Sequence, residues 1–233
     1  MLQFTIQNLF EIGAHFGYSR SRRHPSAASF IFATKDKSDI FNLEETGKRL
    51  KDAEEFVASV AESGKQILFV AGKNEATKIV RGIAENIDTP HVAGRWIGGT
   101  LTNFKEIRKR IDKLERLRKE RDAGERDKYT KLERLMLDRE IEELEGRFGG
   151  LEYMKELPAA LFIVDPRHES AAVSEANQLG IPVVALANSD CNFKAINYPI
   201  PANDSVVKSI EFFTSAIAEA YEKNKKAPTK ATE

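Results

Sequence analysis

A chain of 233 residues, 41% of them hydrophobic, is long enough to bury a sizeable core and is expected to form one or two domains. Its 36 basic and 36 acidic residues cancel, so any binding of nucleic acid must come from local patches of charge. The single cysteine, Cys191, excludes an intrachain disulfide and a thiolate zinc site. The N-terminus lacks the pattern of a signal peptide, and no apolar run reaches the ~18 residues of a membrane span, which predicts a soluble cytoplasmic protein.

Apolar runs that alternate with helical segments predict an α/β body. Residues 1–35 are expected to form a helix, a basic loop and a short strand at 30–33. A helix near 43–63, strand 66–72, helix 75–87 and strand 91–93 follow. Beyond residue 148 come strand 159–165, helix 169–179, strand 181–187, an extended stretch at 198–201 and a last helix after Asp204. Strands so uniformly apolar predict a parallel sheet with helices on both faces.

Residues 104–148 follow a different pattern, with apolar side chains every three or four positions among dense charges. We expect two long helices that reverse at a polar segment with one glycine, residues 121–127, and bury narrow apolar stripes mainly against each other. The predicted architecture is therefore a body (1–103 and 155–222), a protruding antiparallel coiled-coil hairpin (104–154) and a disordered tail (223–233).

Parallel sheets bind ligands beyond the carboxyl ends of their strands, which draws attention to residues 72–75 and 165–169. The first segment has Lys73 but no phosphate-binding glycine motif. The second combines Asp165, Arg167, His168 and Glu169, which resembles a catalytic or metal cluster, yet its spacing favours a strand end that closes onto a helix start. No catalytic residue, metal site or cofactor is predicted, because no nucleophile or metal-ligand motif appears at a recognisable spacing.

The basic residues that favour RNA are grouped locally. Arg20, Arg22 and Arg23 lie close to the stacking rings of Phe16, Tyr18 and His24. Residues 105–121 contain nine bases against four acids, although solvated helix faces with ion pairs between them would give the same pattern. The predicted RNA contacts are Arg20, Arg22, Arg23, His24, Arg95, Lys105, Arg108, Lys109 and Arg110.

Several ordered segments together are more specific than any of these motifs: EIGAHFG at 11–17, IFNLEET at 40–46, RWIGGTLTNF at 95–104, LPAALFIVD at 157–165, EANQLGIP at 175–182 and IPAND at 200–204. Over nearly the whole chain, these segments resemble bacterial small-subunit ribosomal protein S2. The sequence departs from the family at Tyr18, where histidine is usual, at His24-Pro25, where the family has Trp-Asn-Pro, and at Ala187 and Cys191.

The resemblance implies a flavodoxin-like parallel sheet of five strands, with the helical hairpin inserted after the second. It implies a non-catalytic protein that binds small-subunit ribosomal RNA near the junction of head and body, joins late in assembly and helps to recruit the large mRNA-binding ribosomal protein one. In this setting, the glycines at 98–99 would let backbone amides approach phosphates beside Arg95, while Trp96 packs in the core.

Two rival functions use the same elements. A cytosolic α/β protein that binds a nucleotide or metabolite would use the strand ends at 72–75 and 165–169. A coiled-coil adaptor that binds only protein would use the hairpin without the basic loops. Co-sedimentation with small ribosomal subunits separates both from an RNA-binding scaffold.

Overall fold

The computed structural model describes residues 5–124 and 129–225 and contains two sheets. The larger one has five parallel strands in the order β5-β4-β6-β7-β8. Its strands are β4 (Ile67–Ala71), β5 (His91–Ala93), β6 (Ala160–Val164), β7 (Val183–Ala187) and β8 (Tyr198–Pro201). Numbered along the chain, this order reads 2-1-3-4-5, which is the flavodoxin-like order predicted above.

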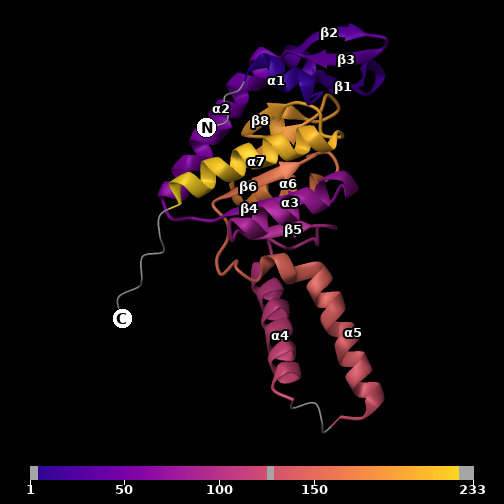
Figure 1. Cartoon of the computed structure of the whole chain (residues 1–233), viewed down its shortest axis with the longest axis vertical. Coiled ribbons are helices and arrows are strands. Elements are labelled where there is room, and N and C mark those ends of the chain that lie inside the picture. Colours follow the sequence, from indigo (N-terminus) through magenta and orange to yellow (C-terminus); the bar gives the residue numbers. More distant parts are fainter. Residues whose placement is uncertain (1–4, 125–128, 226–233) are drawn as a thin grey trace.

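Helices cover both faces of this sheet, because successive side chains of each buried strand point to opposite sides. Ile67, Phe69 and Ala71 of β4 pack in one core, while Leu68 and Val70 pack in another. The first core lies under α2 (Leu43–Glu62), α3 (Asn74–Asn86) and α7 (Val207–Asn224), and the second contains α6 (Ser170–Leu179) (Figure 1). The predicted two-sided sheet is confirmed.

A second, smaller sheet precedes the five-stranded sheet in the sequence, and the sequence analysis predicted only one of its strands. After α1 (Ile6–Glu11), the antiparallel strands β1 (Phe16–Ser19), β3 (Ser38–Phe41) and β2 (Ile31–Lys35) lie side by side in that order. Asp36 and Lys37 both adopt positive φ, at 49° and 67°, and join β2 to β3 as a two-residue hairpin loop. The loop lacks the Asn-Gly or Asp-Gly signal by which such hairpins are recognised.

The helices predicted at 104–148 are α4 (Phe104–Asp122) and α5 (Lys131–Phe148), which follow β5 and extend away from the sheet (Figure 1). Thr130 starts α5 with a capping box that includes Glu133. The apolar stripe of α4 is buried along its length, but Leu132 and Met136 near the start of α5 are 66% and 62% exposed. The two stripes were expected to bury mainly against each other, and Leu132 and Met136 depart from that expectation.

The base of the helix pair shares its core with the sheet. Ile107, Ile111 and Phe148 belong to the same buried cluster as Val70 and Trp96. The described helix α7 also continues to Asn224, past residue 223 where the tail was expected to begin, while residues 226–233 of that tail lie outside the described residues. Among the described residues, no helix combines the length and the apolar character needed to cross a membrane.

Candidate nucleic-acid interface

The crevice at the carboxyl ends of β4 and β6 is filled by the protein's own side chains. The Gly72 amide, just after β4, donates a hydrogen bond of 3.0 Å to Oε1 of the buried Glu169. A Cβ at Gly72 would meet this carboxylate and would lie 2.8 Å from the Gly94 carbonyl oxygen, so the position requires glycine. Nδ1 of His168 lies 2.6 Å from the same Glu169 oxygen. The carboxylate thus occupies the place at the start of α3 where a phosphate would bind.

Lys73, the residue after Gly72, also occupies this crevice and contacts residues at the neighbouring strand ends. Its Nζ lies 3.3 Å from Asp165, 3.4 Å from Asp204 and 3.2 Å from each of the hydroxyls of Tyr18 and Ser205. Burial alone would lower the pKa of Lys73, but Asp204 and Asp165 outweigh that effect and raise it. Burial and the nearby Asp165 raise the pKa of Asp204 to about 6. The Lys73 ammonium therefore interacts with carboxylates and hydroxyls of the protein itself.

The carboxylates at 165–169 have structural roles. Asp165 has a positive φ of 59° and accepts a hydrogen bond of 3.1 Å from the His168 amide, which closes the turn from β6 toward α6. Within residues 5–124 and 129–225, no three histidine, cysteine or carboxylate side chains come together as metal ligands would. Burial raises the pKa of the Cys191 thiol, which keeps it protonated.

A basic groove lies between the N-terminal segment and α6. Its volume is about 590 Å³, and arginines from two distant parts of the chain line it: Arg22 and Arg23 from one side and Arg167 from the other. The carboxylate of Asp190 also lines the groove, but its side chain is 5% exposed and it pairs with Arg167 at 2.6 Å. Three guanidinium groups and one carboxylate therefore line the basic groove, which leaves it with a net positive charge.

Contacts with the small sheet and with the loop after β7 hold the predicted residues of the N-terminal segment in place. The guanidinium of Arg22 lies 4.7 Å from the ring centre of Tyr18, a cation–π contact. Arg23 is half-buried and pairs with the buried Asp39 at 3.5 Å. The amide of His24 donates to the Ser189 carbonyl at 2.8 Å. These contacts fix the segment before any ligand arrives.

His24 and Arg20 lie on either side of the arginine pair. His24 lines the basic groove, and its Nδ1 accepts from the Ser26 amide at 3.2 Å, so this nitrogen caps the short helix Pro25–Phe30. Arg20 is exposed in the turn after β1, with its backbone amide bonded to the Lys37 carbonyl. Arg20 does not line the basic groove.

The glycine loop after β5 does not offer its amides to a phosphate as the sequence suggested. The Glu175 carboxylate of α6 accepts hydrogen bonds from the amides of Gly99, Leu101 and Thr102 at 2.8–3.1 Å and from the indole Nε1 of Trp96 at 3.0 Å. Burial alone would raise the pKa of Glu175, but these N–H donors outweigh it and lower the pKa below its usual range. The expected packing of Trp96 is confirmed, since only 8% of it is exposed.

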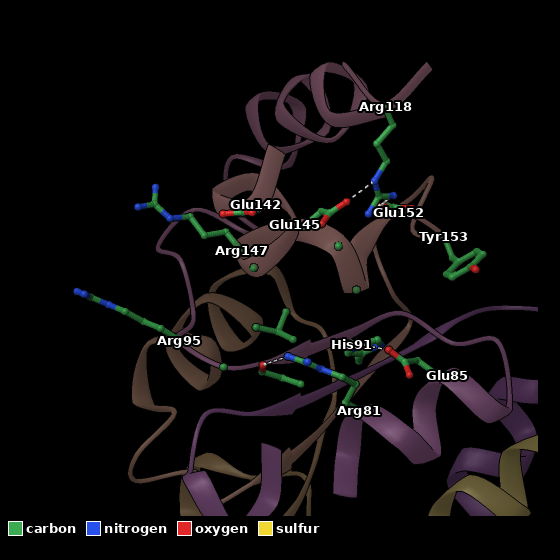
Figure 2. A pocket seen from close by; sticks show the side chains of 16 residues that line it. Arg81, Glu85, His91, Arg95, Arg118, Glu142, Glu145, Arg147, Glu152 and Tyr153 are labelled. Carbon is green, nitrogen blue, oxygen red and sulfur yellow. Dashed lines mark hydrogen bonds and ion pairs between the residues drawn. The ribbon is translucent and has the colours of Figure 1, made fainter. Parts of the chain in front are cut away.

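Arg95 is exposed and lies apart from the arginine pair, in a cleft of about 540 Å³ between the sheet edge and the base of α5. Figure 2 shows Arg95 and Arg147 extending from opposite walls of this cleft, while Arg118 turns toward Glu145 and Glu152. Four arginines and four glutamates line the cleft, so its net charge is close to zero. This balance makes it a weaker anion site than the basic groove.

The predicted bases of α4 divide into two groups. Arg108 bonds Asp112 at 2.8 Å and Glu115 at 2.9 Å, and Lys109 pairs with Glu106 at 2.6 Å, so each has an acidic partner on its own helix. Lys105 and Arg110 are exposed. Figure 1 places α4 at the opposite end of the molecule from the small sheet and the N-terminal segment. The structure therefore does not bring all nine predicted residues into one surface.

The resemblance suggested by the sequence is borne out by comparison with known proteins. The family model described as ribosomal protein S2 matches residues 9–224, which is nearly the whole chain. The chain belongs to the ribosomal protein S2 family. Members of the S2 family are structural, non-enzymatic components of the small ribosomal subunit and take part in translation in the cytoplasm.

Individual S2 relatives align with most of the chain. The small ribosomal subunit protein uS2 of Salinibacter ruber is 44% identical over 216 residues, covering 93% of this chain and 68% of that protein. The uS2 proteins of Chloroherpeton thalassium and Borrelia hermsii are 43% and 39% identical over 220 residues, covering 94% of this chain and 88% and 87% of those proteins. The S2 assignment supports a structural role in the small ribosomal subunit over the metabolite-binding rival.

Arg167 is the residue of the basic groove that the sequence analysis did not select. It was considered only as part of the acid, guanidinium and imidazole cluster at 165–169, where it has no basic neighbour in the sequence. Its partner Asp190 lies 23 positions away, and the fold alone brings both beside Arg22 and Arg23.

Proposed function

We propose that the protein binds small-subunit ribosomal RNA through the basic groove, near the junction of head and body, and supports subunit assembly. The observation that carries the proposal is the convergence of Arg22, Arg23 and Arg167 on one groove that is lined by a single carboxylate, Asp190. Guanidinium groups bind phosphate oxygens in a bidentate manner and remain charged at all physiological pH values. A chain of zero net charge thus gains a strongly basic surface locally.

The helix pair α4 and α5 would provide a second attachment point as a coiled-coil hairpin inserted in the body. Lys105 and Arg110 are exposed on α4, and Arg95 is exposed in the loop before it. Because this end of the molecule lies far from the N-terminal segment in Figure 1, the two surfaces would contact separate stretches of RNA. Linked contacts strengthen each other through effective concentration.

The test is rebinding of the full chain to small ribosomal subunits depleted of this protein, measured by co-sedimentation at several salt concentrations. Replacing Arg22 and Arg23 by alanine should weaken rebinding and reduce the log-log salt slope by about 0.7–0.9 for each lost phosphate contact. Lys51→Ala with Lys78→Ala is the matched control, since both lysines are exposed on α2 and α3, away from the basic groove. Equal slopes for the two double variants would refute the proposal.

A neighbouring ribosomal protein, such as the large mRNA-binding protein one, is proposed to dock beside the small sheet. Phe10, Phe16 and Phe32 are 61%, 52% and 76% exposed there, which is unusual for phenyl rings on a soluble surface. Phe10 and Phe32 line an apolar hollow of about 290 Å³. Phe32→Ala should reduce the amount of that protein that co-sediments with the subunits without changing RNA binding. Unchanged recovery would remove this surface from consideration.

A further inference from the structure

The basic groove has an apolar floor, which contact with the RNA backbone alone does not require. Pro25 and Pro166 line it together with Val173 of α6 and Ile196 from the loop before β8. Val173 and Ile196 are 7% exposed and belong to the core cluster, so this floor is rigid. Phosphates bind to charged and polar groups, whereas the faces of nucleobases bind to apolar surfaces.

Polar side chains that can read the edge of a base surround this floor. Ser170, Ser174 and Asn177 of α6 and Asn192 all line the basic groove. Asn177 donates through Nδ2 to the Ala195 carbonyl at 3.0 Å, and Oδ1 of Asn192 accepts from the Lys194 amide at 3.1 Å. Each amide is thereby fixed in orientation, with its other polar end still available for a further hydrogen bond.

The basic groove also has a suitable size and charge. Its volume of about 590 Å³ falls within the roughly 300–1,000 Å³ typical of sites for small molecules. Arg22, Arg23 and Arg167 stand at its rim, and the one carboxylate among its lining, Asp190, is bound to Arg167 at 2.6 Å. An apolar floor, fixed amides and an arginine rim together match the three parts of a nucleotide: base face, base edge and phosphate.

We propose that the basic groove holds one unpaired nucleotide of RNA, with its base against Val173 and Ile196 and its phosphate among the three arginines. The proposal rests on the RNA-binding function proposed above and specifies the structure that is recognised: a bulged or looped-out nucleotide and not a continuous duplex. Bases inside an A-form helix are stacked and cannot reach such a floor, whereas a bulged base is already out of the stack and binds at little cost.

The test compares two hairpin RNAs that differ only in one bulged nucleotide in the stem. The full chain should bind the bulged hairpin about fivefold or more tightly, because stacking one base on protein is worth about 1–3 kcal/mol. Ser174→Leu should abolish this preference, because Ser174 is exposed and lines the basic groove, and a branched aliphatic side chain there fills the groove without adding a flat ring or changing the charge. Gln178→Leu is the matched control, since Gln178 is exposed one turn further along α6 and does not line the basic groove.

The outcomes separate this inference from the proposed function. Equal affinity of the unmodified chain for both hairpins, or a bulge preference that survives Ser174→Leu, would overturn the nucleotide site. If Arg22→Ala with Arg23→Ala still weakened binding to both hairpins, the proposed RNA-binding function would stand without the site. If that double variant bound both hairpins as well as the unmodified chain, the proposed function would fail as well. Circular dichroism melting of each variant establishes that it is folded.

Discussion

The indole Nε1 of Trp96 donates a hydrogen bond of 3.0 Å to the carboxylate of Glu175, a residue 79 positions further along the chain. The same carboxylate accepts from the amides of Gly99 and Leu101 in the loop that leads into α4. Glu175 therefore fastens the start of the helix pair to α6 and the sheet. The Glu175 carboxylate thus accepts hydrogen bonds from backbone amides that would otherwise have no partner.

Glu175→Gln should lower the free energy of unfolding by about 2 kcal/mol at pH 7, because a neutral amide replaces a charge-assisted acceptor and turns an NH₂ group toward N–H donors. The estimate is at the low end for charged hydrogen bonds, since the side chain is partly exposed and water screens it. Urea unfolding followed by circular dichroism measures the change. Gln178→Ala, exposed on the same helix, should stay within about 0.5 kcal/mol of the unmodified chain.

The pH dependence of this loss identifies its cause. Because the folded-state pKa of Glu175 is lowered, its contribution is complete above the unfolded-state pKa of about 4.3 and disappears as pH falls through the lower folded value. The difference between the unmodified chain and Glu175→Gln should therefore be constant near neutrality and shrink below about pH 4. A difference that persists in acid would mean that packing, and not charge, holds the loop.

Lys73→Met should destabilise the protein by about 3–5 kcal/mol, since it leaves Asp165 and Asp204 in the crevice without a cation. The pKa of Asp204 is already raised to about 6, and loss of the ammonium would raise it further. A carboxyl group whose folded-state pKa is raised gains stability as pH falls through that value, so the variant should recover part of the loss between about pH 8 and 5.

Adding Asp204→Asn to Lys73→Met removes one of the two stranded charges and should restore much of the stability at pH 7. Thermal melts at pH 8, 7 and 5 measure both variants. If Lys73→Met were as stable as the unmodified chain, the amine would not be committed to these carboxylates, and the crevice would again be available to a ligand.

Tyr18 should position Arg22 through its ring and not through its hydroxyl. The guanidinium lies 4.7 Å from the ring centre, whereas the hydroxyl contacts Lys73 and Ser205 on the side of the sheet. Tyr18→Leu should weaken subunit rebinding about two- to fivefold, while Tyr18→Phe should retain it. Combining Tyr18→Leu with Arg22→Ala should cost no more than Arg22→Ala alone, and strict additivity would show that the two act independently.

The sequence predicted the larger sheet well because its strands are uniformly buried. All five residues of β4, β6 and β7 are buried, and such apolar runs are recognisable without any tertiary information. Two strands of the small sheet were missed because they are short and because β3 carries Asp39, an acidic residue of a type that is rarely buried. Asp39 is fully buried, and its carboxylate is stabilised by a hydrogen bond from the Thr34 hydroxyl and by the ion pair with Arg23, both of which only the fold provides.

The candidate site was only partly predictable, because it is formed by residues that lie far apart in the sequence. The sequence identified Arg22 and Arg23, since they are adjacent, but the third arginine of the basic groove, Arg167, lies more than 140 positions away from them. The role of the glycine loop was misassigned because Glu175, which accepts hydrogen bonds from its amides, lies 76 positions beyond Gly99. Local sequence patterns show which charged and hydrogen-bonding groups are present. Only the fold shows which of these groups already have a partner within the protein.

The helix pair should tolerate removal of its distal half but not of its base. Ile107, Ile111 and Leu114 of α4 and Leu144 and Phe148 of α5 are part of the sheet's own core cluster, so excising 106–147 would expose a large apolar surface on the body. The distal half contributes little to that core, since Leu132 and Met136 are already mostly exposed. Excising the base of the pair and excising only its distal half should therefore have different effects on folding.

Joining Arg118 to Leu137 through a short Gly/Ser linker removes residues 119–136 and keeps every buried residue of the shared core. We expect this variant to unfold cooperatively with a melting temperature close to that of the unmodified chain, whereas excision of 106–147 should abolish cooperative unfolding. The short excision retains Lys105 and Arg110 on α4 and the arginines of the basic groove, so it should rebind depleted subunits at least half as well as the full chain. A large loss of rebinding by the folded short variant would place an essential attachment in the distal half of the pair. Cooperative unfolding of the longer excision would show instead that the base of the pair is dispensable to the core.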